Sequence, residues 1–275
     1  THTKERVVPT NNEPKIRDCF RFLFTNRPLL TLVFSDLIAV LEGIAGIFSV
    51  YYYTLCLGMN SLSIIAGLPG TLVGWGTYPI MQKLEKRFNS RQIVVGATLL
   101  HAAMTVVVFL IGMNFYTNPL VIVPLLMILN VSSAFKNSIK SVIPTKMYGE
   151  TIDYMEWKTG ERNEGMAFSA LTLIGKLTSS LATAMGTFLI PLVGLVRDEK
   201  LDMMVISPDS PINTQFWLWA LITVIPTLLG LLALIPYKFY DLEGEKLAMI
   251  QREVQARRET VSYKVNKTNE VKVKI

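Results

Sequence analysis

A lysine lies in the middle of an apolar segment long enough to cross a membrane: Lys176, within residues 165–190. An ammonium group near the centre of a bilayer costs about 2.5–3.5 kcal/mol on insertion scales, so such a side chain faces a water-filled cavity or a partner. At about 100° per residue, the polar side chains of this segment fall within an arc of about 80°. They are Ser169, Thr172, Lys176, Ser179, Thr183 and Thr187. The spacing predicts a helix with one polar wall.

Two other apolar segments carry a polar stripe at helical spacing. The first contains Thr31, Ser35, Glu42, Gly46, Ser49 and Tyr53, and the second contains Asn130, Ser133, Asn137, Lys140 and Ser141. Glu42 lies near the middle of its segment, where an ionisable group is expected to face a cavity. We expect these three helices, together with a glycine-rich one, to line an aqueous cavity, while more apolar helices support them against lipid.

The chain contains enough apolar segments to be an integral membrane protein, since 51% of its 275 residues are hydrophobic. Each predicted segment is long enough to cross about 30 Å of hydrocarbon as a helix. The expected fold class is an all-α membrane protein with six transmembrane helices. These cover Leu29–Leu55, Leu62–Met81, Ile93–Met113, Leu120–Ser141, Gly165–Pro191 and Phe216–Pro236.

The basic residues are distributed very unevenly between the two sides of these spans. Of 27 lysines and arginines, 22 fall on one side and only Arg197 and Lys200 on the other, with three inside spans. This is the positive-inside pattern, which predicts that both termini are cytoplasmic and that the number of spans is even. The net charge of +6 therefore reflects topology, and we expect no nucleic acid partner.

Three regions follow from this organisation: a cytoplasmic linker at 1–28, a transmembrane bundle at 29–237 and a cytoplasmic tail at 238–275. Cys19 and Cys56 fall on opposite sides of the predicted topology, so no disulfide framework is expected. The chain begins with Thr1, and its polar segment 1–26 contains no apolar core of a signal peptide. We expect the chain to be a piece of a longer protein.

The segment between the fourth and fifth spans identifies a family. An acidic residue precedes Asp153-Tyr154, and Glu164-Gly165 then leads into a helix in which Lys176 follows Thr172 by four residues. This pattern, with Asn26-Arg27-Pro28 before the first span and 225–250 at the end of the last, resembles the glycoside-pentoside-hexuronide:cation symporters. They form the melibiose carrier branch of the major facilitator superfamily. Leu171 stands where the melibiose carrier has an amide, so we expect a substrate other than melibiose.

The resemblance implies twelve helices in two bundles of six, of which this chain supplies helices 7–12, the C-terminal bundle. The missing N-terminal six-helix bundle would carry most of the site for the coupling cation, Na+ or H+; no other cofactor is expected. The resemblance also implies that Lys176 and Thr172 lie at the cation and sugar site, with a possible Na+ near Thr172. The bilayer of the plasma membrane is the expected location.

Each candidate binding residue also has a structural alternative. Lys176 either approaches the other bundle or forms a structural ion pair, with Glu42 as a possible partner. Glu42 either accepts sugar hydroxyls or neutralises Lys176, and the Thr172 hydroxyl either binds a ligand or bonds the preceding turn. Tyr53 is a candidate aromatic surface for a sugar, and Asn137 is expected to border the cavity on its cytoplasmic side.

Two further ionisable groups favour structural roles. For Asp36, nearer the cytoplasm, we expect an interfacial or pairing role, and for His101, on a peripheral helix, hydrogen bonds to neighbours. Charges of alternating sign in the loop after the fourth span predict a cytoplasmic gate, a salt-bridged latch that opens during alternating access. Its residues are Asp153, Glu156, Lys158, Arg162 and Glu164. An ordinary solvated loop is the alternative.

The predicted function is secondary active symport of a sugar or glycoside with Na+ or H+. The alternatives are the same fold carrying a lipid-like or other solute, and a truncated membrane fragment that transports nothing. We expect no enzyme, because the sequence contains no nucleophile elbow, no His cluster with metal-ligand spacing and no phosphate-binding loop.

Overall fold

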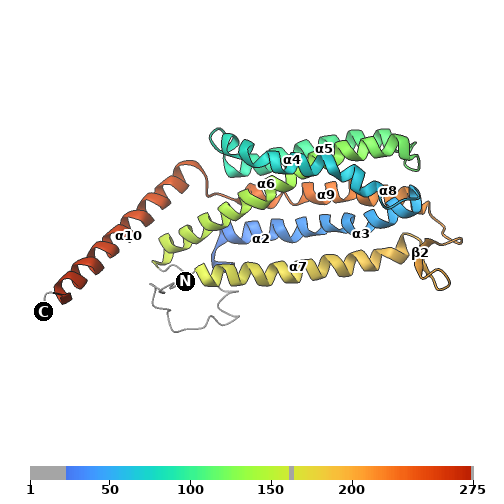
Figure 1. The fold of residues 1–275 in the computed structure, drawn as a ribbon. Helices are drawn as coiled ribbons and strands as arrows, with labels where there is room; N and C mark the ends of the chain where they lie inside the picture. The colour runs from blue at the N-terminus through green and yellow to red at the C-terminus, as the bar shows by residue number, and fades with distance from the viewer. Residues whose placement is uncertain (1–22, 161–163, 274–275) are drawn as a thin grey trace.

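The computed structural model describes residues 23–160 and 164–273. Its helices run side by side, with a short β-hairpin at one end and a helix projecting from the other (Figure 1). The elements in chain order are α2 (Arg27–Ala39), η1 (Val40–Gly43), α3 (Ile44–Tyr51), η2 (Tyr52–Cys56), α4 (Leu62–Glu85), α5 (Ser90–Gly112), α6 (Pro119–Thr159), α7 (Glu164–Leu192), β1 (Leu195–Asp198), β2 (Met203–Ile206), α8 (Thr214–Ile222), α9 (Val224–Leu232), η3 (Pro236–Phe239) and α10 (Gly244–Val273).

Five stretches of the described chain are helical, long and apolar enough to cross a membrane: 27–56, 90–112, 119–159, 167–192 and 214–239. The predicted second span lies within α4, whose 24 residues are about 36 Å long. Helix α4, which contains four glycines and two prolines, is not among these five stretches. A mostly helical chain with membrane-spanning helices agrees with the predicted fold class, whereas the count of six spans stays a prediction.

The first span is one continuous helical stretch with two local irregularities. Asn26 is fully buried and caps it, because its side-chain oxygen accepts a hydrogen bond from the Leu29 amide at 3.2 Å. The Asn26 amide group also donates to the Thr151 carbonyl of α6 at 3.0 Å. The stretch tightens to a 3₁₀ turn at η1 and widens to a π turn at η2. Such irregular turns often mark functional positions in helices, and η1 contains Glu42.

Helix α6 is longer than the sequence predicted. The interpretation of residues 153–159 as part of a charged loop was wrong, since α6 continues through Thr159. Its 41 residues correspond to about 60 Å, roughly twice the thickness of the hydrocarbon. Helix-forming residues such as Glu, Met and Lys continue the pattern until Gly160, which adopts φ +77° and ends the helix. The last turns of α6 therefore project beyond the bilayer.

The sixth predicted span is divided into α8 and α9 at Thr223, where φ is −119° and ψ is −86°. Pro226 lacks the amide that would bond the carbonyl four residues earlier, so the helix breaks in the turn before it. The Thr223 and Thr227 hydroxyls donate to the carbonyls of Trp219 and Thr223, at 2.5 and 3.0 Å. These contacts satisfy backbone groups around the break.

A β-hairpin connects α7 to α8, which the sequence analysis did not predict. Its antiparallel strands β1 and β2 pair Leu195 with Ile206 and Asp198 with Met203. The Asp198 side chain accepts hydrogen bonds from the amides of Lys200 and Leu201, at 2.8 and 3.2 Å, which closes the turn. The hairpin lies at the opposite end of the bundle from α10 (Figure 1).

Helix α6 packs against both α4 and α5, while α7 packs against α2, η1 and α3. Glycine makes the contact between α4 and α6 possible. A Cβ atom on Gly70 would lie 2.8 Å from the Asn130 carbonyl oxygen, a backbone atom that cannot move independently. This close approach holds Asn130 and the rest of its stripe beside α4.

We predict that Gly70→Ala lowers the free energy of unfolding by about 1–3 kcal/mol, the usual range for overpacking. Gly76→Ala is the matched control on the same helix, because a Cβ there would meet nothing within 4 Å. Thermal unfolding of the purified variants in detergent measures both effects. Equal behaviour of the two variants would contradict the close packing of α4 on α6.

Candidate functional site

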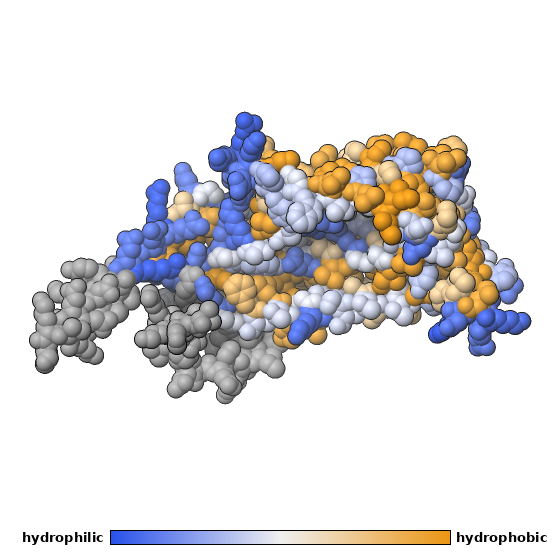
Figure 2. Space-filling model, in the orientation of Figure 1, coloured by the Kyte–Doolittle hydropathy of each residue, from blue (hydrophilic) through white to orange (hydrophobic). Residues whose placement is uncertain are grey.

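A cavity of about 850 Å³ lies between the first span, α6 and α7, with parts of α5 and α9 closing it from behind. Figure 2 shows hydrophilic side chains gathered in a hollow on this side of the otherwise largely apolar bundle. Several predicted residues line the cavity together: Asp36, Glu42, Ser49, Tyr53, His101, Asn130, Ser133, Asn137 and Lys140. The cavity is thus formed by the polar stripes of the first and fourth predicted spans.

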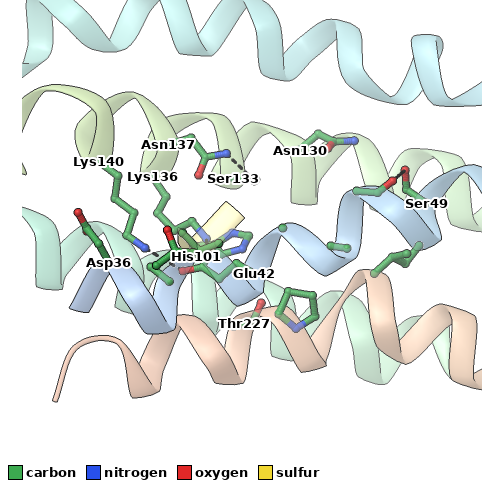
Figure 3. A pocket seen from close by; sticks show the side chains of 18 of the residues that line it. Asp36, Glu42, Ser49, His101, Asn130, Ser133, Lys136, Asn137, Lys140 and Thr227 are labelled. Atoms are coloured by element: carbon green, nitrogen blue, oxygen red, sulfur yellow. Dashed lines mark hydrogen bonds and ion pairs between the residues drawn. The ribbon is translucent and has the colours of Figure 1, made fainter. Parts of the chain in front are cut away.

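Three charged side chains form the centre of the cavity, which we call the Lys–Glu–Lys triad. The Lys136 ammonium lies 2.5 Å from Glu42 Oε2, and the Lys140 ammonium lies 2.8 Å from Glu42 Oε1. Their side chains are 5% and 20% exposed, and that of Glu42 is 15% exposed. The two lysines are four residues apart on α6 and so lie on the same face, toward η1 (Figure 3).

The fold makes room for the Glu42 carboxylate opposite the lysines. A Cβ atom on Gly230 of α9 would lie 2.9 Å from Glu42 Oε1, so this glycine provides the space that the carboxylate occupies. Each carboxylate oxygen then accepts one charge-assisted hydrogen bond, the arrangement that a buried carboxylate needs. The triad therefore connects η1, α6 and α9.

Two neighbours of the triad have polar partners of their own. The Asp36 carboxylate accepts a hydrogen bond from the Tyr148 hydroxyl of α6. His101 Nδ1 lies 3.0 Å from the Ser132 hydroxyl oxygen, and His101 is buried. The predictions of a pairing role for Asp36 and of local hydrogen bonding for His101 agree with these contacts.

A ladder of polar side chains continues from the triad along α6: Asn130, Ser133 and Asn137. The Asn130 amide group donates to the Ala66 carbonyl at 3.1 Å, whereas Asn137 is exposed and donates to the Ser133 hydroxyl at 3.4 Å. The same ladder lines a second groove of about 560 Å³ between α4 and α6, together with the exposed aromatic side chains of Trp75 and Tyr78. Amides and aromatic rings are the groups that bind sugar hydroxyls and sugar faces.

The polar wall of α7 lies elsewhere. Lys176 and Thr172 are exposed, and the cavity is lined instead by their neighbours Leu171, Ile174, Gly175 and Thr178. The alternative that pairs Lys176 with Glu42 was wrong, because Glu42 binds Lys136 and Lys140. The Thr172 hydroxyl donates to the Phe168 carbonyl at 2.8 Å, as the structural alternative expected. Ligand binding by Thr172 and Lys176 stays a prediction.

The sequence analysis missed Lys136, whose side chain is the most buried of the triad. The signal was present: two lysines four residues apart in an apolar helix require a shared anionic partner, and Glu42 was already expected in the cavity. The possible Na+ near Thr172 stays a prediction. Within 23–160 and 164–273, no three His, Cys, Asp or Glu side chains are grouped so that they could hold a metal ion.

The predicted cytoplasmic gate residues lie at the end of α6 and contact α10. Arg258 lies 2.8 Å from Asp153 Oδ1 and 2.5 Å from Glu156 Oε2. Lys158 lies 5.9 Å from the Tyr154 ring centroid, and Glu164 begins α7. Arg162 lies outside the described residues. Two gate residues thus form ion pairs with the C-terminal helix, and the sequence analysis did not predict these pairs.

A buried contact supports this docking. The Tyr240 hydroxyl donates to Glu150 Oε2 at 2.8 Å. Burial, and then the adjacent Glu150 carboxylate, raise the pKa of Tyr240, so the hydroxyl keeps its proton and remains a donor. The Trp157 indole also donates to Glu253 Oε2 at 2.7 Å. Together these contacts attach the segment before α10, and α10 itself, to the projecting end of α6.

For the triad, we predict that Glu42→Gln lowers the free energy of unfolding by about 3–5 kcal/mol, because it leaves the buried Lys136 ammonium uncompensated. Glu85→Gln is the matched control, since Glu85 pairs with Lys146 in an exposed position and should cost about 0–1 kcal/mol. Thermal unfolding in detergent measures both. A small effect of Glu42→Gln would contradict a structural role for the triad.

For the α6–α10 contact, we predict that Arg258→Gln weakens docking, because it removes the cation that joins Asp153 and Glu156. Hydrogen–deuterium exchange of the amides in 244–258 should accelerate in this variant. Arg252→Gln, on the exposed surface of the same helix, serves as the control and should leave the exchange unchanged. Unchanged exchange in both variants would show that Arg258 does not hold α10.

Comparison with known proteins identifies relatives over nearly the whole chain. It is 27% identical to an uncharacterized symporter of Bacillus subtilis, over 93% of this chain and 52% of the relative. It is 26% identical to a putative sulfoquinovose importer of Salmonella typhimurium, over 94% of this chain and 52% of the relative. A glucuronide carrier protein homolog of Escherichia coli is 22% identical, over 93% and 53% of the respective lengths.

The chain thus spans about half the length of these curated relatives. Their names describe transporters rather than enzymes, in agreement with the absence of an enzymatic motif. Residues 1–244 match the family described as MFS/sugar transport protein. With its apolar helices and polar central cavity, the chain belongs to this family of the major facilitator superfamily.

Proposed function

We propose that this chain is the C-terminal half of a secondary active transporter that couples movement of a sugar or glycoside to Na+ or H+. The observation that carries the proposal is the cavity, in which the Lys–Glu–Lys triad and the α6 polar ladder lie inside a membrane bundle. Charged groups at this depth are costly and mark a substrate or ion path. The names of the relatives, a symporter, a sulfoquinovose importer and a glucuronide carrier homolog, support transport of a sugar.

An opposing bundle of six helices completes the transporter in this proposal. The exposed polar wall of α7 supports it: Ser169, Thr172, Lys176, Ser179, Thr183 and Thr187 are all exposed. Lipid cannot stabilise the Lys176 ammonium in this wall, whereas a second bundle enclosing water can. The match to about half of each relative is consistent with that arrangement. The charge distribution supports placing both termini in the cytoplasm, and the plasma membrane is the location that we propose.

Transport would proceed by alternating access, in which the two bundles move around a central substrate. The η1 turn would act as a local hinge, because 3₁₀ geometry holds the helix less firmly than α geometry. The contact of α10 with the end of α6 would act as part of the cytoplasmic gate. Lys176 would approach carboxylates of the opposing bundle, where binding of the cation changes its pairing.

The decisive experiment measures uptake of labelled glycosides by the complete carrier, with and without a Na+ gradient and with and without a proton gradient. Accumulation that depends on one gradient supports the proposal and identifies the cation. Accumulation independent of both gradients, or none across the panel, would contradict it.

For Lys176, we predict that Lys176→Ala abolishes accumulation against a gradient while the protein stays inserted, because the apolar helix inserts more easily without an ammonium. Lys176→Arg keeps the charge but alters its shape and hydration, so it should restore little activity. Membrane abundance, sugar binding and uptake are measured on the same variants. Normal accumulation by Lys176→Ala would remove this residue from the coupling mechanism.

For the 275-residue chain alone, we predict no coupled transport after reconstitution in vesicles, because the polar wall of α7 would face lipid. Gradient-driven accumulation of sugar by these vesicles would contradict the need for a second bundle. Sequencing the encoding DNA for six further helices separates half of a transporter from a truncated fragment.

A further inference from the structure

The groove between α4 and α6 adjoins the central cavity but differs from it in chemistry. Its volume is about 560 Å³, and it shares Gly67, Asn130, Ser133 and Asn137 with the lining of the cavity. The two spaces therefore meet along the α6 ladder. All the residues that line the groove are neutral, whereas the cavity holds the charged triad. A ligand can thus contact the ladder from the groove without contacting the charges.

Trp75 of α4 and Asn137 of α6 reach the groove at nearly the same depth. The Ser138 hydroxyl donates to the Gly74 carbonyl at 3.1 Å, Ser138 directly follows Asn137, and Gly74 directly precedes Trp75. A Cβ atom on Gly74 would lie 3.6 Å from the same hydroxyl oxygen, so α4 and α6 are in van der Waals contact at this level. The aromatic ring and the amide therefore belong to facing walls of one groove.

The position of Trp75 is unusual for a tryptophan in a membrane helix. Its side chain is 78% exposed, and it lies about 20 Å from the start of α4 and about 15 Å from its end. Tryptophans that anchor helices to a membrane lie at the two interfaces rather than at mid-depth. Tyr78 follows three residues later, is also exposed and lines the same groove. Anchoring thus does not explain an aromatic wall beside polar groups at this depth.

The facing wall has free capacity to form hydrogen bonds. Asn137 is exposed, and among the described residues its side chain forms one hydrogen bond, to the Ser133 hydroxyl at 3.4 Å. A side-chain amide has two N–H donors and an acceptor oxygen, so most of this capacity is open to a ligand. Figure 3 shows Asn130, Ser133 and Asn137 in a row along α6. A ligand in the groove would meet these polar groups on one side and Trp75 on the other.

We propose that Trp75, together with Tyr78, is the platform on which a sugar ring packs while its hydroxyls bind Asn137 and Ser133. These residues would make the carrier select cyclic sugars over open-chain ones. The inference rests on the proposed transport function and names specificity-determining residues for it. A pyranose ring carries its hydroxyls around the edge and C–H groups on its faces, and the negative face of an aromatic ring attracts such C–H groups. An open-chain sugar offers no flat face and loses more conformational freedom on binding.

The test uses the complete carrier and two pairs of probes, each with one cyclic and one open-chain compound of equal charge. The neutral pair is methyl β-glucopyranoside and glucitol, and the acidic pair is methyl β-glucuronopyranoside and gluconate. Competition against a labelled glycoside that the carrier accumulates measures the preference for the ring. The variants are Trp75→Leu, Trp75→Phe and the control Trp217→Leu. Trp217 of α8 is also exposed but is not among the described residues that line the cavity or the groove.

We expect the parent to prefer the cyclic member of a pair, and Trp75→Leu to reduce that preference by about tenfold or more, as for loss of an aromatic anchor in a binding site. Trp75→Phe should keep most of the preference, because it retains a flat aromatic face. Trp217→Leu should behave as the parent does. The thermal stability of Trp75→Leu should be unchanged, since the side chain is exposed.

The failures of the two proposals are distinguishable. If the parent shows no preference for the ring, if Trp75→Leu keeps that preference, or if Trp75→Phe loses it to the same extent, the platform proposal is wrong and the transport proposal stands. If Trp75→Leu lowers thermal stability and weakens all four compounds equally, Trp75 packs against the opposing bundle, and the platform proposal is again wrong. If no glycoside of the panel above accumulates, transport of sugars itself is contradicted, and the platform proposal falls with it.

Discussion

The structure depends on satisfying charge inside a membrane bundle. Burying Lys136, Lys140 or Glu42 alone inside the bundle would cost much free energy. Their mutual pairing offsets this cost, because α9 leaves space at Gly230 and η1 presents the carboxylate to α6. The irregular turn, the glycine and the lysine spacing all serve this one contact. A site with such constraints holds three helices in a defined arrangement and keeps polar groups open to a ligand.

Helix α6 carries this charge and connects it to the cytoplasmic end of the molecule. One continuous helix holds the polar ladder, both lysines of the triad, the Tyr148 contact to Asp36 and the residues that bind α10. A displacement at the cavity can therefore reach the α10 contact through a rigid element, without a chain of separate side-chain movements. Gly70 allows α4 to pack closely against this helix, so the groove between α4 and the polar ladder keeps its position relative to α6.

The surface of the bundle divides into regions with different requirements. Large apolar side chains such as Leu72, Leu120 and Phe188 are exposed, as expected for contact with lipid. The wall of α7 is exposed as well, yet it carries Lys176 and a row of hydroxyls that bond back to their own helix, as Thr183 does to the Ser179 carbonyl. Hydroxyls satisfied in this way can face either lipid or water, whereas the Lys176 ammonium cannot be satisfied by its own helix.

Hydropathy and helical period were enough to predict the membrane class, the polar stripes and the cavity-facing position of Glu42, because both act locally along one chain. They also placed the ends of the first span within two residues. The packed helices were needed to show that Glu42 pairs with Lys136 and Lys140 rather than Lys176, that α6 extends to Thr159 and that α10 binds Asp153 and Glu156. Those outcomes depend on which helix faces lie opposite each other and on the space that Gly70 and Gly230 leave between helices, and neither is encoded in the period of any single segment.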